Sequence, residues 1–388
     1  MLINAFVGGM VGLERTVVPL IGTRELHLLL NTAAVSFIIS FGVVKAVMNL
    51  VSGRLADHYG RKRILVLGWF IGIPVPFLIM WAPAWNWIVL ANVLLGINQG
   101  LTWSMAVVMK IDLAGKKNRG LAVGLNEFTG YLAVGFTAFA TGYLAMRYGL
   151  RPRPFYLGVA YALSGLLLSM FMLRETLPYA RLEDTVIAKP GSLNFMAIFK
   201  KTSWGDRSLF TSCQAGLINN LNDGMSWGIF PLFFIAKGLD ITHIGTLKFI
   251  YPAVWGVSQL ATGPLSDRFG RKPFIAWGMV VQAAAICLTV RGANFAVWAL
   301  GSVFLGIGTG MVYPALLAEV VDRSEVSSRA SALGVYRFWR DLGYAVGALF
   351  SGIIADLFGF EWAIGLVGLI TFLSGILVAV QMDGGKSR

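Results

Sequence analysis

The chain has 388 residues, of which 56% are hydrophobic and only 13% are charged, and its formal net charge at pH 7 is +13. Soluble domains carry about 25% charged residues, so this composition argues against a soluble enzyme and predicts a helical membrane protein. The net charge alone would suggest nucleic-acid binding, but where the basic residues lie gives it another meaning.

Twelve nearly apolar segments follow one another along the chain. Segments of about 20 residues can cross the ~30 Å hydrocarbon core of a bilayer as helices. The predicted spans are 2–22, 28–52, 63–82, 85–111, 119–147, 154–173, 208–236, 243–265, 273–291, 294–321, 329–357 and 361–381. The long polar connection at 174–207 divides them six and six. We therefore predict two six-helix domains, 1–173 and 208–388, joined by a linker.

Most lysines and arginines outside the spans lie in loops on the same side as the linker and both termini. Basic loops stay in the cytoplasm, so this asymmetry predicts a protein of the cytoplasmic (inner) membrane with both termini inside. The excess positive charge is then a topology signal, and we expect contact with membrane lipid and not with nucleic acid. Cys213 and Cys287 are isolated in apolar segments and predict no disulfide.

The two halves contain an internal repeat. "GRLADHYGRK" from Gly53 matches "GPLSDRFGRK" from Gly263, and "LGINQG" from Leu95 matches "LGIGTG" from Leu305 at the same offset. A six-helix unit duplicated in the same orientation predicts two halves related by an axis along the membrane normal. Such halves share a binding site near the midplane of the bilayer.

The doubled loop motif resembles the major facilitator superfamily, and so does "RETLP" at 174–178. The resemblance covers nearly the whole chain. It implies an all-α membrane fold of 12 transmembrane helices in two pseudo-symmetric six-helix bundles, with spans 1, 4, 7 and 10 lining a central cavity. We expect Gly53 and Gly60 to allow tight turns. Asp57 is expected to cap a helix or pair with an arginine. The gating set is Gly53, Asp57, Arg61, Lys62, Asp267, Arg271 and Lys45.

One departure from the family concerns drug export. The proton-coupled drug antiporters of the superfamily carry an arginine in R-x-x-Q-G on the fourth span. The aligned stretch of this chain, 96–100, is Gly-Ile-Asn-Gln-Gly. The missing arginine argues against drug export, though not against transport.

Polar residues inside the spans are costly in lipid and mark functional sites. Glu14 and Arg15 are adjacent, point about 100° apart on a helix and need separate partners. In span 7, Asn219, Asn222, Asp223 and Ser226 have the spacing of one helical face, which we expect to line the cavity. The alternative is hydrogen bonding between helices within one bundle.

Two charge pairs between the halves are expected. Arg337 in span 11 aligns with Glu127 in span 5 at the repeat offset, so the two could meet across the symmetry axis. In the family, span 2 packs on span 11, which makes Lys45 and Asp341 an expected ion pair. Whether that pair acts as a gate or is static stays open.

These features predict a secondary transporter for a small polar or anionic solute. We expect it to be a proton-coupled monomer that works by alternating access. Glu14, Glu127, Asp223 and Asp341 are candidates for the coupling proton, and the arginines suit an anion. The candidate site is Glu14, Arg15, Asn98, Gln99, Trp103, Asn126, Glu127, Asn219, Asn222, Asp223, Trp227, Tyr313, Arg337, Arg340 and Asp341.

The sequence predicts no enzymatic activity, no cofactor and no metal. It has no P-loop, and His27, His58 and His243 are scattered. Two other functions stay open. One is a lipid or amphiphile flippase, or a drug exporter, on the same fold. The other is a transporter-like protein with a sensing or assembly role.

Overall fold

The computed structural model describes residues 1–179, 194–324 and 328–383, apart from the side chains of Asp57, 115–122 and Ala330. These residues form helices and no strand. The first part contains α1 (Leu2–Gly12), α2 (Val18–Arg24), α3 (Asn31–Ala34), α4 (Ser36–Tyr59), α5 (Arg61–Gly72), α6 (Pro74–Met80), α7 (Trp85–Tyr148), the 3-10 turn Arg153–Phe155 and α8 (Tyr156–Phe171).

The second part begins with α10 (Phe195–Lys200) and a π-helical turn, Lys201–Gly205. It continues through α11 (Arg207–Ala236), α12 (Ile241–Phe269), α13 (Arg271–Arg291), α14 (Phe295–Arg323), α15 (Arg329–Phe358) and α16 (Phe360–Gln381). Residues 180–193 of the predicted linker lie outside the described residues.

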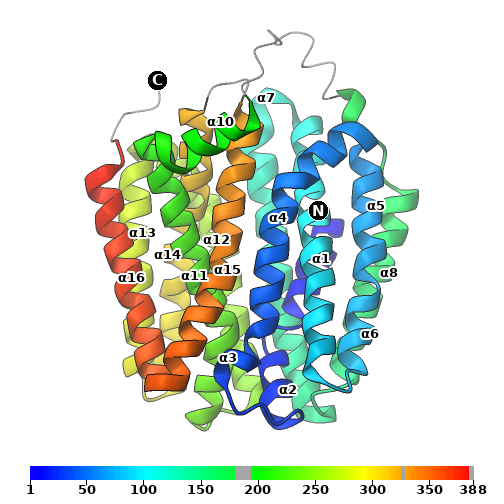
Figure 1. Ribbon diagram of the computed structural model, residues 1–388, viewed down its shortest axis with the longest axis vertical. Coiled ribbons are helices and arrows are strands. Elements are labelled where there is room, and N and C mark those ends of the chain that lie inside the picture. The colour runs from blue at the N-terminus through cyan, green and yellow to red at the C-terminus, as the bar shows by residue number, and fades with distance from the viewer. Residues whose placement is uncertain (180–193, 325–327, 384–388) are drawn as a thin grey trace.

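The long helices run roughly side by side, with α1–α8 on one side of the molecule and α11–α16 on the other (Figure 1). We call these two groups the first and second halves. The end with α10 and the C-terminus is called the linker face, and the end with α2 and α3 the opposite face. Across the boundary, α4 packs on α15 and α7 packs on α12. These are the span 2–11 and span 5–8 contacts that the family resemblance implies.

Among the described residues, eight helices are long and apolar enough to cross a membrane. They correspond to predicted spans 2, 3, 4, 6, 9, 10, 11 and 12. The remaining predicted spans fall on α1 with α2, on the later part of α7, on α11 and on α12. Span 1 is interrupted at 13–17, where Pro19 at the start of α2 cannot donate a backbone hydrogen bond.

Predicted spans 4 and 5 are not separated by a loop. Both belong to α7, which is helical from Trp85 to Tyr148. Trp103 and Glu127 are 24 residues apart, about 36 Å along a straight helix. Their side chains nevertheless form a 2.9 Å hydrogen bond, so α7 folds back on itself. Its two arms are Trp85–Ala114 and 123–148, and the second arm meets α12 where Gly142 faces Gly245.

Small residues let the helices approach closely, as is common in membrane bundles. Gly8 of α1 lies against Gly130 of the second arm of α7, and a Cβ atom added at Gly8 would overlap the carbonyl oxygen of Gly130. Gly365 of α16 is also helical, but has no atom within 4 Å of the same position.

We therefore expect Gly8→Ala to lower the free energy of unfolding by about 1–3 kcal/mol, the usual cost of overpacking. Gly365→Ala is the matched control and should be neutral or slightly stabilising, because alanine is the better helix former. Thermal unfolding of both variants in detergent measures the difference. Equal midpoints would contradict this packing.

Candidate functional site

The interruption between α1 and α2 carries two charged residues into the interior. Glu14 and Arg15 lie in the non-helical segment 13–17, and both side chains are buried. Because neither residue is in a regular helix, their side chains are free to take different directions. Their neighbours belong to different halves, Asp223 of α11 for Arg15 and Asn92 of α7 for Glu14.

Arg15 crosses to the second half and binds Asp223 of α11. Its two terminal nitrogens lie 2.5 and 2.9 Å from the two carboxylate oxygens, a bidentate pair of fully buried groups. The guanidinium also lies 4.7 Å from the centroid of the Trp227 ring. Arginine suits this site because its planar fork matches a carboxylate and stacks on aromatic rings. This ion pair joins the two halves of the molecule.

Lys248 of α12 lies beside this pair, and the sequence analysis missed it. Its side chain is 3% exposed, and its amine donates to the carbonyl oxygen of Ser226 and, at 3.1 Å, to the Ser226 hydroxyl. Asp223 and Arg15 both act on it electrostatically. A lysine five residues inside predicted span 243–265 was the available signal, because an amine at that depth needs a partner.

Glu14 is turned away from Arg15 toward Asn92 of α7. Neither carboxyl oxygen of Glu14 accepts a hydrogen bond within the described structure, and the amide oxygen of Asn92 is also without a donor. The geometry therefore suits a neutral carboxylic acid, because a buried carboxylate without a cation is far more costly.

A second charged cluster lies nearer the linker face. Lys45 of α4 is 3.4 Å from Asp341 of α15, so the expected ion pair is present. Asn49 and Asn220 donate to the same carboxylate at 2.6 and 3.0 Å. Arg340 bonds Asp341 at 2.9 Å.

Arg340 also reaches into the first half. It donates to the hydroxyl of Tyr131, in the second arm of α7, at 3.0 Å and lies 4.2 Å from the Tyr313 ring centroid. Together with Lys45, Arg340 makes this cluster a second connection between the halves.

The expected pair between Glu127 and Arg337 is wrong. Glu127 is buried and accepts hydrogen bonds from Trp103 at 2.9 Å and from Tyr313 of α14 at 3.2 Å. Arg337 is half-buried and makes no ion pair within the described structure. The repeat places the two residues at equivalent depth. The carboxylate of Glu127, however, is hydrogen-bonded to the neutral donors Trp103 and Tyr313 and not to Arg337.

Four predicted site residues instead hold the helices of one half together. Asn98 donates to the Gly68 carbonyl and Gln99 to the Val7 carbonyl, both within the first half. In the second half, Asn222 donates to Gln282, which itself donates to Asn219.

The polar face of span 7 is therefore split. Asn222 also accepts from Thr371, so Asn219 and Asn222 face α13 and α16. Asp223 and Ser226 face the first half and Lys248. Asn126 is likewise local, since its amide oxygen accepts from Lys110.

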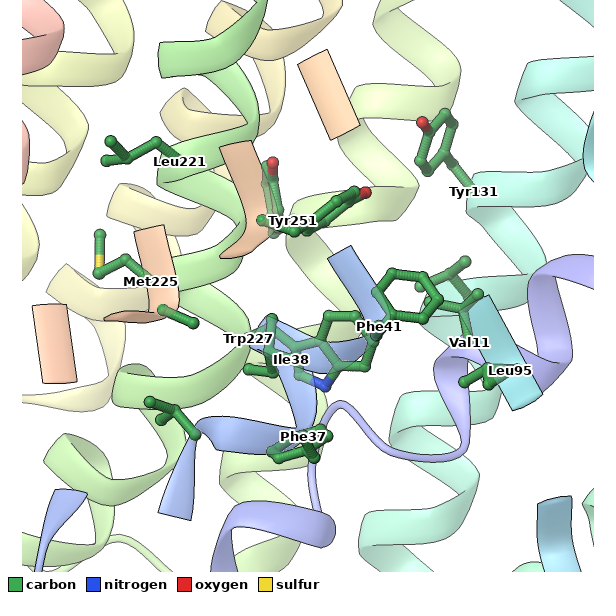
Figure 2. Close-up of a cluster of buried hydrophobic side chains, with 14 of the residues drawn as sticks. Val11, Phe37, Ile38, Phe41, Leu95, Tyr131, Leu221, Met225, Trp227 and Tyr251 are labelled. Carbon is green, nitrogen blue, oxygen red and sulfur yellow. The ribbon is translucent and has the colours of Figure 1, made fainter. Parts of the chain in front are cut away.

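Aromatic side chains fill the boundary between the halves. Trp227 of α11 packs edge-on against Phe37 and Phe41 of α4 (Figure 2). Tyr131 of the first half stacks on Trp255 of the second, with ring centroids 3.5 Å apart. These contacts leave little space at the centre, so the halves are closed on each other in this conformation.

The repeated loop motif lies at the linker face. Gly60 has φ +96°, which favours glycine, but Gly53 is inside α4 with nothing near its Cβ position and makes no turn. The expected turn at Gly53 is therefore wrong. Arg61 pairs with Asp112 at 3.5 Å, and in the second half Arg271 pairs with Asp267 and, at 3.4 Å, with Asp322. The predicted role of Asp57 concerns a side chain outside the described residues.

Glu175, in the "RETLP" stretch, caps the start of α5. Its carboxylate accepts from the backbone N–H groups of Arg61 and Lys62 at 2.9 and 3.1 Å. Partial burial raises the pKa of Glu175, but backbone N–H donors from Leu177, Arg61, Lys62 and Thr176 outweigh it and hold that pKa below its usual value. The motif of the first half is thus tied to the end of the sixth span.

The opposite face carries its own connection between the halves. Asp356, near the end of α15, accepts from the backbone N–H groups of Asn31 and Thr32 at 2.6 and 3.0 Å and from the Thr32 hydroxyl at 2.6 Å. Contacts between the halves therefore occur at three depths: at Asp356, at Arg15 with Asp223, and at Lys45 with Asp341.

The family model of the Major Facilitator Superfamily matches residues 1–219 and again 212–383. The chain belongs to the major facilitator superfamily. An uncharacterised MFS-type transporter of Salmonella typhimurium is 23% identical over 95% of this chain and 92% of its own length. The multidrug resistance protein MdtG of Citrobacter koseri is 25% identical over 80% of this chain and 75% of its own length.

The superfamily fold is also found by comparison with solved structures. The human organic anion transporter MFSD10 superposes with a TM-score of 0.70, covering 97% of this chain and 98% of that chain, at 17% sequence identity. At this identity the likeness concerns the fold alone. The fold class and the family predicted from the sequence are therefore confirmed, and the protein is an integral membrane transporter of the superfamily.

Proposed function

We propose that this protein is a proton-coupled secondary transporter that moves a small polar or anionic solute across the cytoplasmic membrane by alternating access. In this proposal both termini lie in the cytoplasm and a monomer is the working unit. The observation that carries it is the buried Arg15–Asp223 pair, which joins the halves in the interior.

A buried ion pair between two moving bodies links binding to movement. Separating Arg15 from Asp223 would leave two uncompensated charges in a low-dielectric interior, which costs several kcal/mol. The halves can therefore rock apart at this depth only when something replaces a partner. A solute charge or a proton can do so, and each would favour the open conformation through its differential affinity.

The contacts near the two faces suit the gates of such a cycle. Lys45 and Asp341 would close the linker face, and Asp356 with Thr32 the opposite face. In alternating access, one of these contacts opens while the other stays closed. In this proposal Glu14 carries the coupling proton, because its buried carboxyl group accepts no hydrogen bond and forms no ion pair within the described structure and is therefore more stable as the neutral acid.

A drug exporter or amphiphile flippase is the alternative. Relatives named as multidrug resistance proteins, including MdtG and the quinolone resistance protein NorA of Staphylococcus aureus, favour the first of these. Relatives named as probable anion transporters of Arabidopsis thaliana favour the anionic solute, and so do the buried arginines.

The test is uptake of a solute panel by purified protein in proteoliposomes, with and without an imposed pH gradient. The panel includes organic anions, sugars, amino acids, cationic dyes and a fluorescent lipid. We expect saturable uptake of an anion or a polar solute that is driven by the pH gradient. Uptake that is the same with and without the pH gradient would contradict proton coupling. Movement of the dyes or the lipid alone would favour the alternative.

A further inference from the structure

The charges around Asp223 do not balance. Arg15 and Lys248 are both basic, and among the described residues Asp223 is the one carboxylate that forms an ion pair with either of them. Arg15 takes both oxygens of that carboxylate, so Lys248 is left with the neutral oxygens of Ser226. A buried ammonium is normally paired with an anion.

The cluster nearer the linker face is different. There Lys45 and Arg340 share Asp341, which is again two cations for one carboxylate. Glu127 also acts on Lys45 electrostatically, and Arg337, a third basic residue that acts on Asp341, is only half-buried. Around Asp223 no second carboxylate within the described structure forms an ion pair with Arg15 or Lys248. Among the described residues, Lys248 is therefore the one buried basic side chain without an ion pair, whereas Arg15, Lys45, Arg61 and Arg340 each have one.

A narrow cavity with room for about one water molecule lies beside Lys248. Ser226, Tyr251 and Ser302 give it a polar side, while Phe230 and Leu247 give it an apolar side. The Lys248 amine also lies 5.2 Å from the Phe230 ring centroid. The cavity thus combines a buried lysine amine that has no carboxylate partner within the described structure, hydroxyl groups and an apolar wall.

From these observations we propose that Lys248, with Arg15, binds the carboxylate of a monovalent organic acid that has an apolar body. This inference rests on the proposed transport function and names the substrate class. A charged acceptor is a stronger partner for an ammonium than the Ser226 oxygens that Lys248 contacts in the closed conformation. A single carboxylate supplies the anion that a protonated Lys248 lacks, and the wall of Phe230 and Leu247 fits an apolar part of the solute.

Binding of a solute in the cavity beside Lys248, which we call the Lys248 subsite, can also break the ion pair between the halves. A carboxylate beside Lys248 competes with Asp223 for Arg15, which belongs to the other half. Once bound, the solute joins Arg15 of the first half to Lys248 of the second, in place of Asp223. Solute binding and separation of the halves are then coupled, because the carboxylate of the solute replaces Asp223 as the acceptor for Arg15.

The binding test uses acetate, hexanoate and benzoate, each with its neutral amide as a matched probe, and benzylamine as a cation. Stabilisation of the purified full chain against thermal unfolding is measured as a function of concentration. We expect hexanoate or benzoate to stabilise the protein saturably, and the amides and benzylamine not to. Saturable binding by none of the carboxylates, or equal binding of an acid and its amide, overturns the proposal.

Lys248→Met removes the charge and keeps the length of the side chain. Binding of the preferred carboxylate should weaken at least about tenfold, because a hydrogen bond to a charged group is lost. Lys237→Met, at an exposed lysine paired with Glu361, is the matched control and should bind as wild type. If Lys248→Met does not fold, Ser226→Ala, which loses only a hydroxyl beside the amine, should shift the affinity. Wild-type affinity in the variant measured overturns the proposal.

Transport of the same acids in proteoliposomes separates this inference from the proposed function. Binding that depends on Lys248, without any solute movement, keeps the subsite and overturns the transport function. Transport that is unchanged in Lys248→Met keeps the function and overturns the subsite.

Discussion

Asp223→Ala is expected to abolish solute exchange and to lower the free energy of unfolding by about 3–5 kcal/mol. The substitution removes the acceptor of both Arg15 hydrogen bonds and leaves a guanidinium buried without a carboxylate. Removing one partner of a buried ion pair is far more costly than the pair is stabilising, since the remaining charge is not solvated. Chemical unfolding and counterflow in proteoliposomes measure the two effects.

A double variant separates stability from function. Arg15→Met with Asp223→Leu replaces the pair by apolar side chains, so it should recover most of the lost stability. It should still exchange no solute, because the release of the pair is part of the proposed cycle. If the double variant transports normally, the pair has only a structural role. If it is as unstable as Asp223→Ala, the loss comes from packing and not from the unpaired charge.

Glu14→Gln is expected to leave the stability close to that of wild type and to uncouple transport from the pH gradient. Glutamine has nearly the same size as the carboxylic acid and also carries a hydrogen-bond donor, and neither carboxyl oxygen of Glu14 accepts a hydrogen bond that the change would remove within the described structure. A neutral side chain that cannot release a proton should still allow exchange of solute. It should not allow a pH gradient to drive accumulation.

Three measurements on Glu14→Gln decide this. Its unfolding midpoint should match wild type, whereas Glu14→Leu, which offers no donor, should unfold earlier. Uptake under an inward pH gradient should fall to the level seen without one. The infrared band of a protonated carboxyl group should lose intensity in Glu14→Gln. Accumulation that still follows the gradient would assign the coupling proton to another residue.

The fold was predictable because it depends on regular patterns. Long apolar segments, basic loops on one side and the loop repeated from Gly53 and Gly263 all report on average properties of whole helices. The family match confirms the fold that they indicate. The helical connection between predicted spans 4 and 5 was missed, because polar residues between two apolar segments are the usual signal of a loop.

The candidate site was only partly predictable, for a physical reason. Lys45 and Asp341 could be paired because the family resemblance gives the helices that touch. The partners of Glu127 could not be predicted. Side chains of several helical segments lie near its carboxylate, and small differences in their lengths and positions determine which of them form the hydrogen bonds.

Which side of a helix faces the centre was equally hard to predict. Asn222 and Asp223 are neighbours on span 7, yet one faces α13 and the other Arg15 of the first half. Sequence spacing gives the relative direction of two side chains. The absolute rotation of the helix comes from packing.

The hydrogen bonds at Asp356 have a consequence for the direction of flux. Asp356 and Asp341 lie on the same helix, α15, about 22 Å apart. Asp356 binds the first half near the opposite face, and Asp341 binds it nearer the linker face. If the proposed cycle holds, weakening one of these contacts favours the conformation in which that face is open. In the proposed cycle, substitutions at Asp356 and at Asp341 would therefore shift the balance between the two open conformations in opposite directions, although both residues belong to one helix.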